Sequence, residues 1–278
     1  MRKKTSIAGE TAILGLIALL TPWHTAEAQD AAIPDLSGLW IAGGFDPPLT
    51  GRGGVRMHPE YIQRGTRDEN RNRQNPIPPI ADLSDPILKP WAVERLRSIV
   101  ERRIGGEIIP EARSQCLPMG TPMLISEGGP RLILQTADRV TIVNEELPEV
   151  RHIYLNAAHP ENIVPSWYGE AVGHYEDGAL AVTTIGISAK TWVDDFLTPH
   201  TEAMRVSERY TLLEDGDSIE VSFTVEDPET FNEPWSGIVF YERAPEGREF
   251  QEIRCSEYNY DVFTGQTLPM PTATKLDF

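Results

Sequence analysis

From residue 131 onward, the chain is a succession of short β-rich runs separated by turn residues. The runs span residues 131–136, 139–144, 150–156, 170–175, 179–187, 205–213, 218–226, 237–243 and 251–256. Asp177-Gly178 and Asp215-Gly216 each lie between two runs, where a hairpin turn requires positive φ. About nine consecutive strands with short links predict a mainly β fold, an antiparallel up-and-down sheet that closes into a barrel to remove its edges. A two-layer β-sandwich is the alternative.

The preceding part of the chain has a different composition. Residues 31–130 are rich in proline, glycine, arginine and asparagine, and proline removes a backbone donor and fixes φ. We therefore expect residues 29–130 to form an irregular extension. It should pack on a barrel domain of residues 131–278, within one folded unit.

One helix is predicted inside this extension. Asp85-Pro86 supplies a candidate N-cap and first turn, and Gly105-Gly106 ends the pattern. Apolar residues between them recur at three- and four-residue spacing, as on one face of a helix. These residues are Val93, Leu96, Val100 and Ile104.

Residues 1–28 have the three parts of a Sec-type signal peptide. Three basic residues at positions 2–4 precede an apolar run over 11–20, and Ala26-Glu27-Ala28 places small residues where signal peptidase cuts. An uncleaved anchor is the alternative, but a membrane-spanning helix needs about 20 apolar residues. We expect cleavage before Gln29 and a periplasmic or extracellular protein without a membrane span.

The chain is strongly acidic, with a formal net charge of -17 at pH 7. Removal of residues 1–28 takes away three basic and two acidic residues, a net of +1, and leaves a charge of -18. Such a field repels phosphate backbones and anionic lipid headgroups. Nucleic acids and membrane surfaces are therefore not expected as partners.

Cys116 and Cys255 are the only two cysteines. In an oxidising compartment they predict one disulfide, which contributes about 4 to 5 kcal/mol in the chain-entropy model. A catalytic thiol is the alternative, but it requires an electropositive environment that neither neighbourhood clearly supplies.

Familiar catalytic and cofactor motifs are absent from the sequence. It contains no G-x-S-x-G elbow, H-E-x-x-H, P-loop, G-x-G-x-x-G after a strand, or C-x-x-C. No two histidines have the spacing that usually holds zinc. We therefore expect neither a cofactor nor a metal ion.

Two long segments between predicted strands concentrate aromatic and titratable residues. Residues 157–170 contain His159 and Trp167, and residues 188–204 contain Trp192, Asp195 and His200. Large rings in a wet loop are unfavourable unless they pack on the protein core or on a ligand. The second case predicts a cavity at the barrel mouth with tryptophan walls. Its acid–base groups would be His159, Asp195 and His200, because the ordinary pKa of histidine is near neutrality.

Polar strand residues extend this candidate site if they face the barrel interior. Tyr154 shares a face with His152, and His174 shares one with Glu176, because side chains alternate along a strand. An inward Arg209 would anchor a carboxylate or enolate, whereas an outward one forms an ordinary ion pair. We expect Tyr154 and Arg209 to bind substrate, with Arg209 inward and paired.

Several short motifs lie between residues 116 and 226. They are Cys116-x-Pro-x-Gly, His159-Pro160, Pro165-Ser166-Trp167-x-Gly169, Gly173-His174-Tyr175-Glu176-Asp177-Gly178-x-Leu180, His200 and Glu208-Arg209. In these motifs the chain resembles a group of uncharacterised exported bacterial β-rich proteins. That group more often has Gly-x-Trp-Glu-Gly-Asp-x-Leu in the fourth motif, so His174-Tyr175 and Asp177-Gly178 are departures. The resemblance covers a little under half of the chain and implies a β-rich module without a known reaction.

The strand rhythm alone also resembles lipocalin-like proteins, which include ligand carriers as well as lyases and isomerases. Together these features predict a secreted, cofactor-independent enzyme of the lyase, isomerase or hydratase type. Its substrate would be a small hydrophobic or aromatic molecule in the barrel-mouth cavity. The alternatives are a periplasmic lipocalin-like carrier of an apolar ligand and a structural envelope protein. Convergence of His159, Asp195 and His200 would distinguish the enzyme from the carrier.

Overall fold

The computed structural model describes residues 33–42, 53–61, 79–107, 109, 112–145, 149–251, 260–261 and 266–267. The predicted signal peptide and Cys255 lie outside these residues, so export and the disulfide stay predictions. In the part of the chain that is described, no helix is long and apolar enough to span a bilayer.

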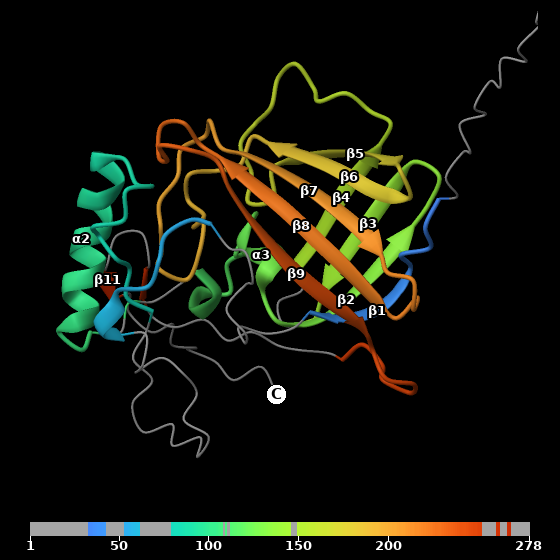
Figure 1. The fold of residues 1–278 in the computed structure, drawn as a ribbon, viewed down its shortest axis with the longest axis horizontal. Helices are drawn as coiled ribbons and strands as arrows, with labels where there is room; N and C mark the ends of the chain where they lie inside the picture. Colours follow the sequence, from blue (N-terminus) through green and yellow to red (C-terminus); the bar gives the residue numbers. More distant parts are fainter. Residues whose placement is uncertain are drawn as a thin grey trace, which may run out of the picture. The chain divides into compact units, whose positions relative to one another are not determined.

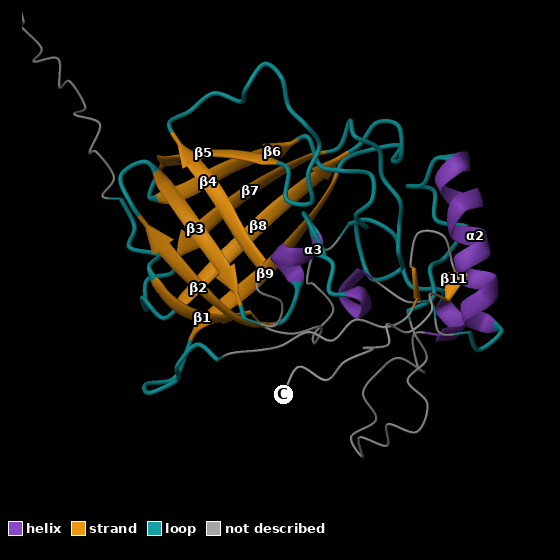
Figure 2. Cartoon of the chain, turned by 180° about the vertical axis from the view of Figure 1, so that it is seen from behind, coloured by secondary structure: helices purple, strands orange, loops and turns teal. Residues whose placement is uncertain are grey.

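Nine strands form a closed barrel, which confirms the predicted fold class (Figure 1). The strands are β1 (Gly38–Ala42), β2 (Gly129–Gln135), β3 (Arg139–Asn144), β4 (Glu149–Leu155), β5 (Glu170–Glu176), β6 (Ala179–Ile185), β7 (Arg205–Leu212), β8 (Ser218–Glu226) and β9 (Trp235–Arg243). Figure 2 shows from behind how these strands tilt across one another. Asp177 and Gly178, between β5 and β6, have φ of 46° and 72°, as the hairpin signal predicts.

The strand that completes the barrel comes from the N-terminal region. Trp40 of β1 pairs with Arg131 of β2 and with Arg243 of β9. The barrel therefore does not begin at residue 131, and residues 29–130 are not merely an extension packed on it. Of the expected last strand at 251–256, only Gln251 is described, and it lies in no strand; residues 252–256 lie outside the described residues. A five-residue strand in a proline- and glycine-rich region is too short to give a recognisable alternation.

All neighbouring strand pairs are antiparallel except β4 and β5, which run parallel. The purely antiparallel up-and-down prediction is wrong at this pair. Parallel neighbours need a crossover that returns the chain to the starting end of the sheet. Residues 156–169 supply that crossover. The topology therefore requires this segment as the connection between two parallel strands.

Alternation of side chains determines what enters the barrel. In β4, Glu149, Arg151, Ile153 and Leu155 are buried, and the residues between them are exposed. The pattern of β7 likewise buries Val206, Glu208 and Tyr210 and leaves Arg205, Ser207 and Arg209 on the outside. Each strand therefore contributes one face to the core and one to the outer surface.

A buried ion pair joins β4 and β7, which are not neighbours in the barrel. The Arg151 guanidinium donates to both carboxylate oxygens of Glu208, at 2.7 and 2.5 Å, and to Thr184 Oγ1 at 2.8 Å. The Tyr210 hydroxyl donates to the same carboxylate at 2.8 Å. The Arg151 and Glu208 side chains are 2% and 0% exposed. Side chains thus occupy the space where the lipocalin-like prediction placed a hollow.

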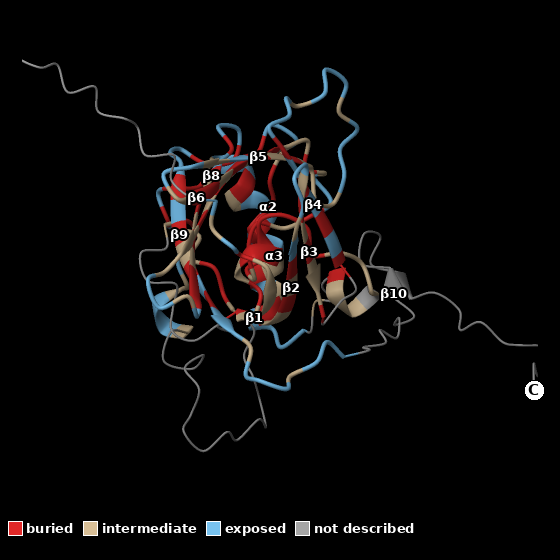
Figure 3. Cartoon of the chain, turned by 90° about the vertical axis from the view of Figure 1, so that its right-hand side faces the viewer, coloured by how far each residue is buried: buried red, intermediate tan, exposed pale blue. Residues whose placement is uncertain are grey.

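A short helix, α3 (Met123–Ser126), closes one end of the barrel and lies within the ring of strands in Figure 3. Arg131 donates to the carbonyl oxygens of Leu124, at 3.0 Å, and Glu127, and the Tyr241 hydroxyl donates to the Ile125 carbonyl at 2.8 Å. The last carbonyls of a helix have no partner within it, so these donors stabilise α3. Two inward side chains of the barrel therefore hold the closing helix.

The predicted helix is α2 (Pro90–Ile104), which begins four residues after the expected start and has Gly105 as its C-cap. Proline has no backbone N–H group, but the N–H groups in the first turn of a helix have no acceptor within the helix, so Pro90 is tolerated there. Its Leu96 and Val100 belong to the same buried cluster as the barrel core. The remaining short elements are a 3₁₀ helix, η1 (Ala112–Gln115), and the paired strands β10 (Tyr260–Asp261) and β11 (Gln266–Thr267).

Arg151→Met is expected to lower the free energy of unfolding by about 3–5 kcal/mol, because it leaves Glu208 buried without its counter-charge. Denaturant titration measures this loss. Arg151→Met combined with Glu208→Leu should recover much of it. The matched control, Arg209→Met on the outer face of β7, removes an exposed ion pair and should cost at most about 1 kcal/mol. Equal losses in the two single variants would contradict the assignment of the buried pair.

Candidate functional site

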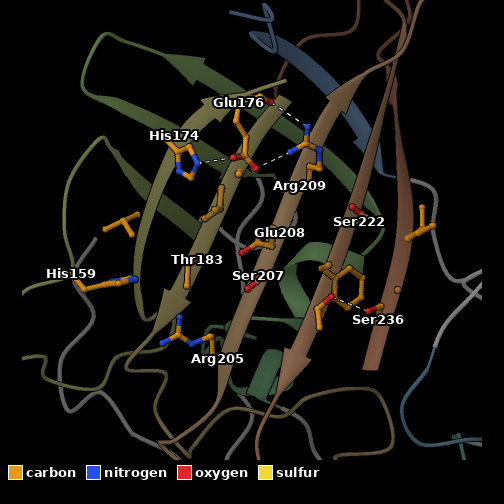
Figure 4. A pocket seen from close by; sticks show the side chains of 17 residues that line it. His159, His174, Glu176, Thr183, Arg205, Ser207, Glu208, Arg209, Ser222 and Ser236 are labelled. Atoms are coloured by element: carbon orange, nitrogen blue, oxygen red, sulfur yellow. Dashed lines mark hydrogen bonds and ion pairs between the residues drawn. The ribbon is translucent and has the colours of Figure 1, made fainter. Parts of the chain in front are cut away.

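A groove of about 690 Å³ lies on the outer side of the barrel, over β5 to β9 (Figure 4). Its floor consists of the strand residues that alternate with the core. His159, from the crossover between β4 and β5, also lines it. The charged and imidazole side chains in the lining are His159, His174, Glu176, Arg205, Arg209 and the inward-facing Glu208.

His159 has an imidazole that is shielded from water and unpaired. Nδ1 and Nε2 are both buried and have no hydrogen-bond partner in the structure as described. Burial lowers the pKa of His159, and the positive charge of Arg205 lowers it further. The negative charge of Glu170 raises it by less, so the net shift is downward. At neutral pH the ring is therefore neutral and keeps a lone pair that can accept a proton.

Arg205 is the first residue of β7, and Figure 4 shows its guanidinium turned toward the His159 ring. Among the residues described, no hydrogen bond or ion pair engages this guanidinium. The planar guanidinium matches the geometry of a carboxylate or phosphate. The groove thus combines a neutral base with an unneutralised cation at one end.

Three charged or titratable side chains form a chain at the other end of the groove. Arg209 lies 3.1 Å from Glu176, and Glu176 lies 3.1 Å from Nε2 of His174. Arg209 is paired, as predicted, but it faces outward. The expectation of an inward Arg209 is wrong because Glu208 and Tyr210, its neighbours in β7, occupy the interior.

The structure does not bring the three predicted acid–base residues together. His200 is 3% exposed, its Nδ1 donates to the Thr201 carbonyl at 2.8 Å, and its Nε2 accepts from the Thr191 hydroxyl at 2.7 Å. The backbone carbonyl of Asp195 accepts from Arg103 at 2.9 Å. His159 has no hydrogen bond to either residue, and neither lines the groove. His200 instead joins two parts of the 188–204 segment.

The predicted aromatic residues also lie outside the groove. Trp192 packs against Met119 and Met123, so the packing explanation of this ring holds. The carbonyl of Trp167 accepts from the Thr121 backbone N–H at 3.2 Å, which places it beside the same segment. Tyr154 is exposed on the outer face of β4.

A second cluster of polar and charged side chains lies inside the barrel. Arg131, Asn144 and Glu149 occupy one row across β2, β3 and β4. Oε1 of Glu149 accepts from the Met119 N–H at 2.7 Å, and its Oε2 is buried without a partner in the described structure. Burial raises the pKa of Glu149, and burial together with the charge of Glu149 raises the pKa of Tyr168.

Sequence reasoning missed both Arg205 and Glu149. Arg205 lies in a predicted strand, and its spacing of two from Ser207 and of four from Arg209 is the signal that the three residues share a face. Glu149 lies one residue before the predicted start of its strand, so alternation within the predicted strand does not place it inside the barrel.

No family model matches the chain, and no curated protein matches it. Within the described ranges, no group of three or more histidine, cysteine, aspartate or glutamate side chains is placed to hold a metal ion.

Glu149→Gln should make stability less dependent on pH. A carboxyl group with a raised pKa in the folded state contributes stability that is present below its unfolded pKa, near 4.3, and is lost as pH rises through the folded pKa. Glutamine does not titrate, so the variant should become more stable relative to the wild type as pH rises from about 4 to about 8. Thermal unfolding across this range, with exposed Glu226→Gln as control, measures the difference. A constant difference would refute the burial effect.

Proposed function

We propose that the protein is an enzyme of the lyase, isomerase or hydratase type that moves a proton on a small organic carboxylate bound in the outer groove. His159 is the general base, and Arg205 binds the carboxylate. The observation that carries this proposal is the neutral, unpartnered His159 imidazole beside an unpaired guanidinium.

The proposed chemistry follows from the placement of a cation, Arg205, beside a neutral base, His159. A hydrogen on the carbon next to a carboxylate becomes acidic when a cation stabilises the negative charge that develops on the carboxylate oxygens. His159 takes that proton, since its lowered pKa keeps it in the basic form at neutral pH. The freed electron pair then forms a double bond, and a neighbouring hydroxyl leaves with a proton as water. In an isomerase the proton returns to a different carbon instead.

His174 supplies a second imidazole at the opposite end of the groove. Its Nε2 lies 3.1 Å from Glu176, which is itself paired with Arg209. A carboxylate in this position orients the ring and fixes its tautomer. His174 is therefore the group that we assign to protonating the leaving group or the product.

The site proposed here differs from the barrel-mouth cavity for a hydrophobic or aromatic substrate. The groove is on the outer wall, and its cations favour an anionic substrate, while Val172, Ala181 and Ile238 offer contacts for a carbon skeleton. A carrier that encloses an apolar ligand has little support, because the Arg151–Glu208 pair and its hydrogen-bond partners occupy the interior.

The proposed setting is the periplasm or the extracellular space. The signal-peptide pattern of residues 1–28 supports export, and the presence of two cysteines, Cys116 and Cys255, supports a disulfide. The net charge of -17 supports a partner that is a small molecule rather than a nucleic acid.

His159→Gln should slow proton transfer by about 10²- to 10⁴-fold, because glutamine cannot take up the proton. The measurement is exchange of the hydrogen next to the carboxylate for deuterium, followed by NMR across a panel of hydroxy acids and sugar acids. His152→Gln, on the exposed outer face of β4, is the matched control. Exchange at the wild-type rate in His159→Gln would remove His159 from the mechanism.

The pH dependence of His159 should respond to Arg205. Because burial and Arg205 lower the pKa of His159, the basic ring should persist below pH of about 6.5. Arg205→Met removes a positive neighbour, so the pKa of His159 should rise and the acidic limb of the rate profile should move to higher pH. NMR titration of the His159 ring tests this without a substrate. An unchanged titration in Arg205→Met would show that the two groups are not coupled.

A further inference from the structure

Four hydroxyl side chains form one row across the floor of the groove. Thr183 of β6 pairs with Ser207 of β7, Ser207 pairs with Thr224 of β8, and Thr224 pairs with Ser236 of β9. All four residues line the groove. Neighbouring strands lie about 4.8 Å apart, so the row places one hydroxyl group on each successive strand at that interval.

Most of the hydrogen-bonding capacity of this row is unused. Thr224 and Ser236 share one hydrogen bond of 2.8 Å. Over the described ranges, the side-chain hydroxyls of Thr183 and Ser207 bond to no other protein group. A hydroxyl donates one hydrogen bond and accepts two, so the row can meet the hydroxyl groups of a ligand in either direction.

Strand formation does not by itself account for this row. Threonine favours strands, but serine is not among the residues that do, and two of the four positions are serine. The outer face elsewhere on the barrel also has exposed apolar side chains. Leu134 of β2, Val150 of β4 and Phe240 of β9 are exposed there.

Charge is arranged around the row. Arg205 and Arg209 lie two residues to either side of Ser207 on the same face of β7, so each side of the row has a guanidinium. Glu176 neutralises Arg209, whereas Arg205 has no ion pair in the described structure. A complementary ligand therefore has several hydroxyl groups and one carboxylate at the Arg205 end.

We propose that the groove binds sugar acids of the uronate class, with the hydroxyl row on the ring hydroxyls and Arg205 on the carboxylate. This inference rests on the proposed function and names its substrate. The net charge of -17 repels long polyanions, so the ligand is a free uronate or a short oligouronate.

Uronates fit the proton transfer assigned to His159. The carbon next to the carboxylate carries one hydrogen, and the following carbon carries an oxygen substituent. His159 takes the hydrogen as a proton, the electron pair forms a double bond between the two carbons, and the carbon–oxygen bond breaks. The leaving oxygen takes up a proton and departs as water or as a sugar hydroxyl. No oxidant or reductant is needed.

Calorimetric titration of the full chain with four probes tests the ligand class. Galacturonate should bind, whereas galactose, without the carboxylate, and cyclohexanecarboxylate, without hydroxyls, should bind at least tenfold more weakly. Thr183→Val with Ser207→Ala should weaken galacturonate about tenfold and leave cyclohexanecarboxylate unchanged. Thr211→Val, on the outer face of β7 beyond the groove, is the matched control. Tighter binding of digalacturonate than of galacturonate would identify the oligosaccharide as the ligand. Equal binding of the two would identify the free acid as the ligand.

The outcomes separate this inference from the proposed function. If Arg205→Met weakens both acids but the hydroxyl variants change neither, the sugar-acid class is overturned while the carboxylate site stands. If the hydroxyl variants weaken galacturonate but His159→Gln leaves formation of the unsaturated product unchanged, the ligand class stands and the assigned base is wrong. Failure of galacturonate to bind overturns the inference.

Discussion

The ion pair between Arg151 and Glu208 determines which face of β7 points into the barrel. Two charges removed from water are tolerated when they are paired and hydrogen-bonded, and here Thr184 and Tyr210 complete the set. Because side chains alternate with a period of two, a slip of one residue would bury Arg209 and expose Glu208. The groove residues of β7 are thus positioned by an interaction on the opposite side of the same strand.

Much of the fold follows from the sequence because alternation and turn residues are local signals. The strands β2 to β9 and the helix α2 lie close to their predicted positions. The two failures concern information that is not local. β1 is short and far in sequence from β2, and the parallel pairing of β4 with β5 depends on where residues 156–169 return.

The candidate site could be predicted only by residue type. His159 and Arg209 were selected from the sequence and do line the groove, whereas Asp195, His200, Trp167, Trp192 and Tyr154 do not. Alternation shows which residues share a face but not which face is inside. On β7 the inner face holds Val206 and Tyr210 together with Glu208, whose ion-pair partner is 57 positions away in the chain, and no local pattern reveals that partner.

The parallel pairing of β4 and β5 has a consequence for how such a site can change over time. The floor of the groove belongs to a hydrogen-bonded ladder, in which each alteration disturbs neighbouring strands. His159 belongs to the crossover, whose length and composition are constrained only by the distance it must cover. The proposed base is therefore encoded apart from the strands that form the floor of the groove, so exchange of a single loop can change the base and leave that floor intact.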